Sequence, residues 1–171
     1  FDLIVAAQDW HPHHHGSFAA NYPGNKPGDR ITLNGLKQIL WPVHCVQNRR
    51  GAEFASTFDR SRVVRVFQKG IDPRIDSYST FFDNAHRRAT GLGDFLKEKA
   101  VTDIYLVGLA LDYCVKFSAL DARGIGLNVH VVVDACRGIA LEPGDLKEAL
   151  EEMEQSGATI LQSSALRSKA L

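Results

Sequence analysis

Excess charge, long apolar runs and a disulfide framework are all missing from this 171-residue chain. Lysine plus arginine and aspartate plus glutamate both number 20, so a polyanion such as nucleic acid is not an expected partner. No run of about 18 apolar residues occurs, and no basic segment precedes an apolar one, so we expect neither a membrane span nor a signal peptide. Three cysteines are an odd number in a chain too large to need disulfides, so we expect a reducing compartment, the cytoplasm.

The first residues contain no methionine and lead at once into Leu3 to Ala7, an apolar stretch that is typical of a buried strand. Domains rarely begin in mid-strand, so we expect an upstream segment that this sequence does not contain. The length is that of one ordinary domain. We therefore predict a single domain over residues 1–171 that is incomplete at its N-terminus.

Strand-like apolar runs alternate with helical patterns along the rest of the chain. Further strands are predicted over residues 63–67, 104–107, 129–133 and 159–162, and helices over residues 92–100, from Asp112 to Gly124 and from Pro143 to Gly157. Residues 19–36 are rich in Asn, Pro and Gly and are predicted to form a long irregular loop. This alternation predicts an α/β fold of three layers, a mostly parallel sheet with helices on both faces.

Cys114 follows the strand over residues 104–107 and lies in the first turn of the next predicted helix, for which Asp112 is a good N-cap. Backbone N–H groups and the helix dipole stabilise a thiolate there and can also hold an oxyanion. Cys114 is therefore a candidate nucleophile. The alternative, that it is a small buried hydrophobic residue, stays open on this stretch alone.

Histidines cluster after the first strand, at Asp9-x-His11 and His13 to His15, and His44 lies on a later loop. Imidazoles with one carboxylate suit zinc, iron or manganese, and water in the remaining positions would make an open site. Two other interpretations stay open, because the run could be a scar of an affinity tag or simply solvated loop residues.

Lys69 follows the predicted strand over residues 63–67, and the apolar residues of that strand indicate that it is buried. A lysine beside a cysteine lowers the thiol pKa, although most lysines are solvated surface residues. Lys69, the histidine cluster and Cys114 each follow the carboxyl end of a predicted parallel strand. Because ligands bind at that end of open α/β sheets, we expect the three features to meet there.

Seven segments together resemble bacterial nicotinamidases, which are isochorismatase-like cysteine hydrolases. The segments are residues 8–12 (Gln-Asp-Trp-His-Pro), 15–18 (His-Gly-Ser-Phe), 41–47 (Trp-Pro-Val-His-Cys-Val-Gln), 69–70 (Lys-Gly), 76–81 (Asp-Ser-Tyr-Ser-Thr-Phe), 108–115 (Gly-Leu-Ala-Leu-Asp-Tyr-Cys-Val) and 134–138 (Asp-Ala-Cys-Arg-Gly). They occur in the family's order from about residue 4 to about residue 140. The resemblance implies hydrolysis of nicotinamide to nicotinic acid and ammonia in NAD salvage, and acceptance of pyrazinamide.

The resemblance also implies roles for single residues. Cys114 would form a thioester with the substrate, and Lys69 would support its charged states. The family has a cis peptide before the residue that matches Ala110, so one is expected between Leu109 and Ala110, with the N–H groups of Ala110 and Cys114 facing the oxyanion. The ring of the substrate would contact Trp41, Tyr78 and Tyr113. One divalent ion, zinc or iron and less commonly manganese, would be held by Asp9, His11, His15 and His44, with His13 and His14 as bystanders.

One departure from the family concerns the general base, an aspartate on the family's first strand that has no counterpart in this sequence. Leu3 to Ala7 corresponds to the second strand, so the first strand-helix unit is missing from this sequence. Neither Asp112 nor Asp134 matches the base. Three further interpretations stay open: another amidase of the superfamily, a metal-binding or inactive fragment, and a redox role for Cys114 with Cys136. Beyond a small-molecule substrate, the sequence leaves a homo-oligomer open as a partner.

Overall fold

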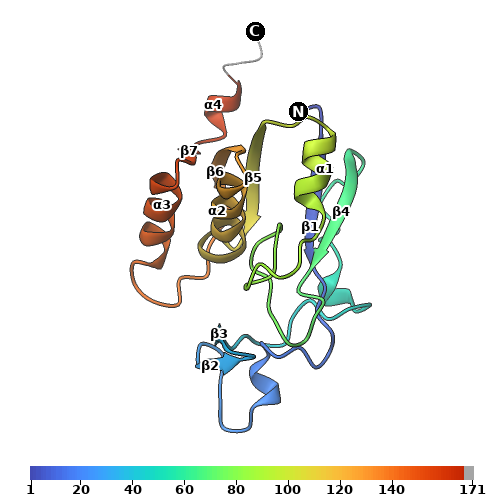
Figure 1. Ribbon diagram of the computed structural model, residues 1–171, viewed down its shortest axis with the longest axis vertical. Coiled ribbons are helices and arrows are strands. Elements are labelled where there is room, and N and C mark those ends of the chain that lie inside the picture. Colours follow the sequence, from blue (N-terminus) through green and yellow to red (C-terminus); the bar gives the residue numbers. More distant parts are fainter. Residues whose placement is uncertain (168–171) are drawn as a thin grey trace. The chain divides into compact units, whose positions relative to one another are not determined.

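The computed structural model describes residues 1–167, which form two compact units, one over residues 1–90 and one that begins at Gly91 (Figure 1). In this described part of the chain, no helix has the length and apolar composition needed to cross a membrane. Parallel strands and helices make up the larger elements, so the predicted α/β class is confirmed.

The first unit contains two parallel strands, β1 (Ile4–Asp9) and β4 (Val63–Lys69). Their register pairs the last residue of each strand, Asp9 with Lys69. Ala6 of β1 and Phe67 of β4 are buried, but Val64 and Val66 are exposed, so the prediction of buried strands is wrong for most of these positions. The strand pair therefore delivers a carboxylate and an ammonium side by side at its carboxyl end.

A β-hairpin occupies part of the segment that the sequence predicts as an irregular loop. Its strands, β2 (Arg30–Leu33) and β3 (Leu36–Ile39), pair antiparallel around Asn34 and Gly35, whose φ angles are 49° and 87°. Positive φ at both central residues is the signature of a type I′ turn, for which Asn-Gly is the preferred sequence. The loop prediction is wrong over these residues. Two 3₁₀ turns complete the unit, η1 (Ala19–Asn21) and η2 (Arg50–Ala52).

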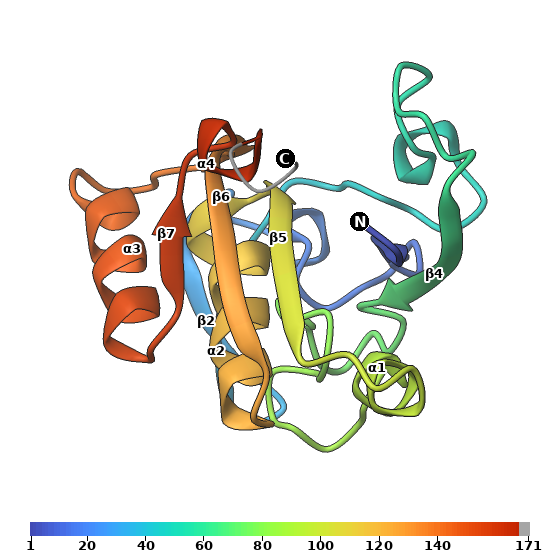
Figure 2. The same cartoon turned by 90° about the horizontal axis from the view of Figure 1, so that it is seen from above.

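The second unit contains a parallel sheet in the order β5-β6-β7, with β5 over Asp103–Leu109, β6 over Asn128–Arg137 and β7 over Thr159–Leu161 (Figure 2). Its helices are α1 (Leu92–Glu98), α2 (Lys116–Gly124), α3 (Asp145–Gln155) and α4 (Ser164–Arg167). A π-helical turn, η3 (Leu111–Val115), connects β5 to α2. Helix α2 packs against α3 and β6, and Val129, Val131 and Met153 are almost fully buried in this core.

The helix predicted to open at Pro143 begins instead at Asp145. Gly144 precedes it with a φ of 105°, a left-handed conformation that glycine adopts readily. Because this conformation is not helical, the helix does not extend back through Gly144 to Pro143. Ala149 and Met153 are the buried residues of this helix, while Leu146 is exposed.

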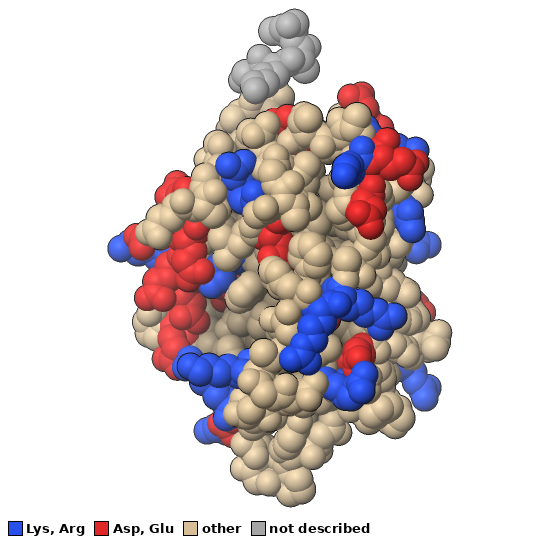
Figure 3. Space-filling model, viewed as in Figure 1, with Lys and Arg blue, Asp and Glu red and all other residues tan. Residues whose placement is uncertain are grey.

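Acidic side chains gather over α3 (Figure 3), which contributes Asp145, Glu148, Glu151, Glu152 and Glu154. Two of these carboxylates pair with lysines, Glu152 with Lys116 at 3.1 Å and Glu151 with Lys147 at 3.3 Å. The hydrophobic side of the helix faces the core, so the charged side is the solvated face of an amphipathic helix.

Candidate active site

Backbone hydrogen bonds join the loop after β1 to the loop after β3. The N–H of His11 donates to the carbonyl of Cys45 at 3.0 Å, and that of Gln47 donates to the carbonyl of His11 at 2.8 Å. Further along, the N–H of Trp41 donates to the carbonyl of Ser17 at 2.7 Å. These bonds place His44 beside the histidines that follow β1.

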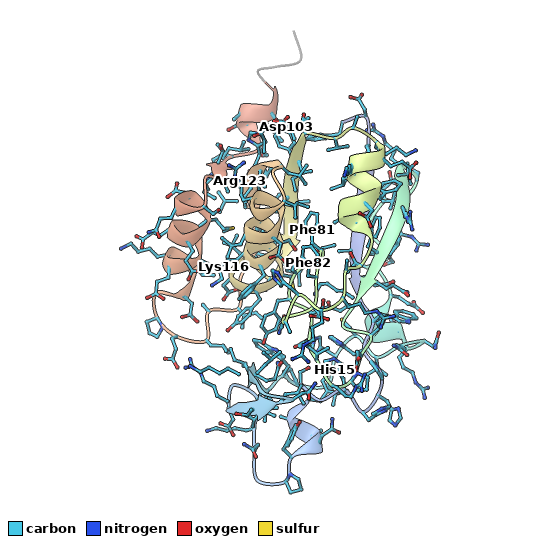
Figure 4. The ribbon with its side chains drawn as sticks, in the orientation of Figure 1. His15, Phe81, Phe82, Asp103, Lys116 and Arg123 are labelled. Atoms are coloured by element: carbon cyan, nitrogen blue, oxygen red, sulfur yellow. The ribbon has the colours of Figure 1, made fainter. Side chains whose placement is uncertain are left out.

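Three imidazoles and a carboxylate meet between these loops. The ring centroid of His11 lies 4.4 Å from that of His15 and 4.8 Å from that of His44. One potential ligand atom from each of Asp9, His11 and His44 lies within 4.8 Å of the others. His11 and His15 are buried, and Figure 4 shows His15 among the side chains of the loops that follow the carboxyl end of β1. The structure thus brings three of the four predicted metal ligands, Asp9, His11 and His44, into one group, and the fourth, His15, lies against His11.

Each histidine of this cluster is held through its Nδ1 atom. His11 Nδ1 lies 2.8 Å from the carbonyl oxygen of Gly70, and His44 Nδ1 lies 2.8 Å from that of Pro42. A carbonyl oxygen can only accept a hydrogen bond, so the Nδ1 atom of each of these two rings carries the ring proton. The Nε2 atom of each ring then presents a lone pair. His15 Nδ1 contacts Ser17 Oγ at 2.8 Å, and its Nε2 is buried with no hydrogen-bond partner among the described residues. A buried, unpartnered imidazole nitrogen fits a metal ligand.

Burial favours the neutral form of two of these imidazoles, His11 and His15. Burial lowers the pKa of His15 to about 4, and burial likewise lowers the pKa of His11. Only the neutral ring can donate a lone pair to a metal ion. At neutral pH these two imidazoles are therefore in the protonation state that metal binding needs.

Lys69 forms an ion pair with Asp9, the carboxylate of the histidine cluster. The lysine Nζ atom is 2.5 Å from Asp9 Oδ1 and 2.7 Å from the carbonyl oxygen of Ser77, and Lys69 is buried. Burial alone would raise the pKa of Asp9, but the charges of Lys69 and the nearby histidines lower it overall. Asp9 is thus an ionised carboxylate that pairs with the Lys69 ammonium and lies beside the imidazoles of His11 and His44.

Gly70, the second residue of the Lys-Gly motif, is required by this packing. A Cβ atom there would clash with the His11 ring, and the φ of Gly70 is 65°. Both the contact and the conformation exclude a side chain. The glycine lets the backbone approach His11 closely enough for its carbonyl to hold the ring.

A buried polar network to which the sequence assigns no role lies next to the histidines. Asp76 has a ligand atom within 4.8 Å of atoms of His11 and His15. Its Oδ2 accepts from Gln38 Nε2 at 3.1 Å, and Gln38 also donates to the hydroxyl of Tyr78 at 3.1 Å. Asp76 is the first residue of segment 76–81, a polar run from which it could have been suspected. No sequence pattern marks Gln38.

The two aromatic residues predicted to contact the substrate ring in this unit lie together. The rings of Trp41 and Tyr78 have centroids 6.3 Å apart and are inclined by 83°, an edge-to-face arrangement. Gln38 fixes the Tyr78 hydroxyl. The two rings thus pack edge to face within the first unit.

Cys114 lies in η3, the turn at the carboxyl end of β5. It is half-buried and, within residues 1–167, forms no disulfide, whereas Cys136 is buried. The peptide bond between Leu109 and Ala110 is cis, as the resemblance predicts. The carbonyl of Ala110 accepts from the N–H groups of Tyr113 and Val115 at 3.1 and 3.0 Å, which closes the turn around the cysteine.

Asp112 does not cap the following helix, so that prediction is wrong. Neither η3 nor α2 has a side-chain cap at its N-terminus. Asp112 is buried, and its two oxygens accept from the N–H groups of Ile139 and Ala140 at 3.0 and 2.8 Å. It ties the cysteine turn to the segment after β6, a contact 27 residues away that local spacing does not reveal.

Comparisons with known proteins identify relatives of this chain. A family model described as the isochorismatase domain matches residues 27–165. A nicotinamidase of Escherichia coli (strain K12) is 45% identical over 159 residues, which are 93% of this chain and 74% of the relative. A solved nicotinamidase/pyrazinamidase of Acinetobacter baumanii has a TM-score of 0.94 at 43% identity, covering 97% of this chain and 80% of that one. The pyrazinamidase of Pyrococcus horikoshii, solved in complex with zinc, has a TM-score of 0.72 at 36% identity, covering 94% and 75%.

Proposed function

The chain belongs to the isochorismatase family, and on this premise we propose that it is a metal-dependent nicotinamidase that also accepts pyrazinamide. The observation that carries the proposal is the ion pair of buried Lys69 with half-buried Asp9, beside three histidines that are anchored through Nδ1. Such a cluster combines a cation for developing negative charge with a donor set for a divalent ion. The product, nicotinic acid, would enter NAD salvage.

We propose that Asp9, His11, His15 and His44 hold the ion. The unpartnered, buried Nε2 of His15 supports this assignment, since a metal ion would satisfy an atom that is otherwise costly to bury. The zinc of the Pyrococcus relative supports zinc, and the nitrogen-rich donor set suits iron and manganese as well. An ion held by these residues would supply a Lewis acid for the pyridine nitrogen of the substrate.

Cys114 is the proposed nucleophile. Its sulfur forms a bond to the carboxamide carbon, the C–N bond breaks, and the nitrogen leaves as ammonia after receiving a proton. Water then attacks the thioester, which releases the carboxylic acid and restores the thiol. The N–H groups of Ala110 and Cys114 are proposed to stabilise the oxyanion in both steps, and Lys69 to support the charged states.

The proton transfers need a general base, and Asp112 is not suited to that role. Both of its carboxylate oxygens already accept backbone N–H groups, which fits a structural role. The resemblance assigns the base to the aspartate of the family's first strand, which matches no residue of this sequence. Trp41, Tyr78 and Tyr113 are proposed to contact the pyridine ring, with Gln38 holding the Tyr78 hydroxyl in place.

The cellular setting completes the proposal. No disulfide joins Cys45, Cys114 and Cys136 in the described part of the chain, which supports a reducing compartment and hence the cytoplasm. We keep a homo-oligomer as a proposal, to be tested by the mass of the protein in solution.

Ammonia release from nicotinamide by the full-length protein tests the function. We expect release that disappears in Cys114→Ala and persists in Cys136→Ala, a matched removal of a second thiol that the reaction does not use. Pyrazinamide should be hydrolysed too, whereas acyclic amides should not. Ammonia release that survives in Cys114→Ala would reject the thioester route, and selective turnover of acyclic amides would point to another amidase of the family.

A further inference from the structure

His13 and His14 are the two histidines of the loop after β1 that the buried cluster does not use. Both are exposed, and their Nδ1 atoms lie 3.4 Å apart. The ring centroids are separated by 4.7 Å with the planes inclined by 72°. Two imidazoles thus present neighbouring nitrogen atoms to solvent.

The separation of these nitrogens corresponds to that of two ligands on one metal ion. Two nitrogens bound tetrahedrally to zinc at about 2.0–2.1 Å lie about 3.3–3.4 Å from each other. As a hydrogen bond between nitrogens, 3.4 Å is long. We propose that His13 and His14 form a second, solvent-exposed site for a divalent first-row ion, with water in the remaining positions.

The backbone holds the two histidines in place. The N–H of His15 donates to the carbonyl of Pro12 at 3.0 Å, so His13 and His14 are the two central residues of a hydrogen-bonded turn. The turn is fixed beyond its end by His15, which is fully buried. Little backbone entropy remains to be lost when both rings bind one ion, which is the usual advantage of a preorganised chelate.

The chemistry of the pair also limits which ions it accepts. Two imidazoles without a carboxylate suit Cu²⁺, Ni²⁺ and Zn²⁺, with Cu²⁺ bound most strongly, and do not suit Mg²⁺ or Ca²⁺. Two protein ligands make a weaker and more open site than the buried cluster. The exposed ion should therefore exchange with solvent while the buried one stays bound.

Equilibrium dialysis of the metal-loaded protein against Ni²⁺ or Zn²⁺, followed by elemental analysis, tests the proposal. The wild-type protein should bind one ion beyond that of the buried cluster, and His13→Ala and His14→Ala should each lose this ion and keep the buried one. The matched control is His130→Ala, which removes a partly exposed imidazole that stacks on Tyr105 and should change nothing. Absence of the additional ion in the wild type, or its persistence in both variants, would overturn the proposal.

Electron paramagnetic resonance of bound Cu²⁺ gives a readout that does not depend on stoichiometry. The exposed copper should show hyperfine coupling to two imidazole nitrogens in the wild type and to one in either single variant. A spectrum unchanged by both substitutions would place the copper elsewhere. Neither result depends on the amidase activity, so failure of this site and failure of the proposed function are distinguishable.

Discussion

The unit over residues 1–90 contains a cluster of charged and imidazole side chains, whereas in the unit that begins at Gly91 the features around Cys114 are mainly those of the backbone. Asp9, Lys69 and the histidines contact one another directly, and each side chain has a proposed chemical role. Around Cys114 the features are a cis peptide, a π-helical turn and a carboxylate that accepts backbone N–H groups with both oxygens. Substitutions should therefore act through charge in the first unit and through backbone order in the second.

The largest effect is expected from Lys69→Met, which removes the cation beside Asp9. Breaking a buried ion pair from one side leaves an uncompensated charge and should cost about 3 kcal/mol, the lower end for such pairs because the Asp9 side chain is 22% exposed. Amidase activity should fall by about 100-fold or more, as for loss of one group that stabilises developing charge. Urea unfolding and ammonia release measure the two effects.

Lys116→Met is the matched control in the second unit. Lys116 pairs with Glu152 at 3.1 Å, but the Glu152 side chain is half exposed, so its loss should cost less than about 1 kcal/mol. Equal losses of stability in the two variants would contradict the charge-based character of the first unit.

Ser17→Ala is expected to weaken metal binding without removing a ligand. Ser17 Oγ contacts His15 Nδ1 at 2.8 Å, and loss of such an orienting partner typically lowers metal affinity by about 10–100-fold. Competition with a chelator of known affinity measures the change. Ser79→Ala serves as the control, because Ser79 is equally a buried serine of this unit but its Oγ accepts from the N–H of Phe81. A similar loss of metal affinity in both variants would mean that Ser17 acts only through stability.

Asp112→Asn should loosen the backbone around the cysteine in the second unit. An amide can accept from Ile139 or Ala140 through its oxygen but not from both in the present geometry, so one charge-assisted hydrogen bond is lost at about 1–2 kcal/mol. Faster hydrogen exchange at Ile139 and Ala140 is the direct readout. The control is Asp134→Asn, whose carboxylate bonds Ser163 at the exposed surface and should matter less. Unchanged exchange in Asp112→Asn would show that the tether does not order this segment.

The contrast between side-chain features in the first unit and backbone features in the second explains which features the sequence can predict. Asp9, His11 and Lys69 are found because strand ends are recognisable from short apolar runs, and the register then brings Asp9 and Lys69 together. The hairpin is missed although Asn34-Gly35 is a strong turn signal, because the surrounding residues are rich in loop formers.

Backbone features of the second unit are less accessible. The cis peptide before Ala110 is predicted through the family resemblance alone, since no local pattern of side chains marks it. The cap prediction for Asp112 fails because a buried aspartate that bonds residues 27 and 28 positions later has the same local appearance as a helix cap. Contacts between distant segments are determined by tertiary packing, and a single sequence does not display them.

The smallest effect is expected at Cys136, the buried thiol of β6. Burial raises the pKa of Cys136 above its usual value, so the folded protein keeps this proton at a pH where the unfolded chain loses it. Stability from this thiol is therefore complete below the unfolded pKa and decreases as the pH rises through alkaline values. Between about pH 7 and about pH 10, the free energy of unfolding in urea should decrease more for the wild type than for Cys136→Ala, since other groups titrate equally in both.

At about pH 8, iodoacetamide should modify half-buried Cys114 in the folded protein and leave Cys136 intact. Rapid modification of Cys136 would show that β6 opens to solvent. It would contradict the view that backbone order characterises the second unit.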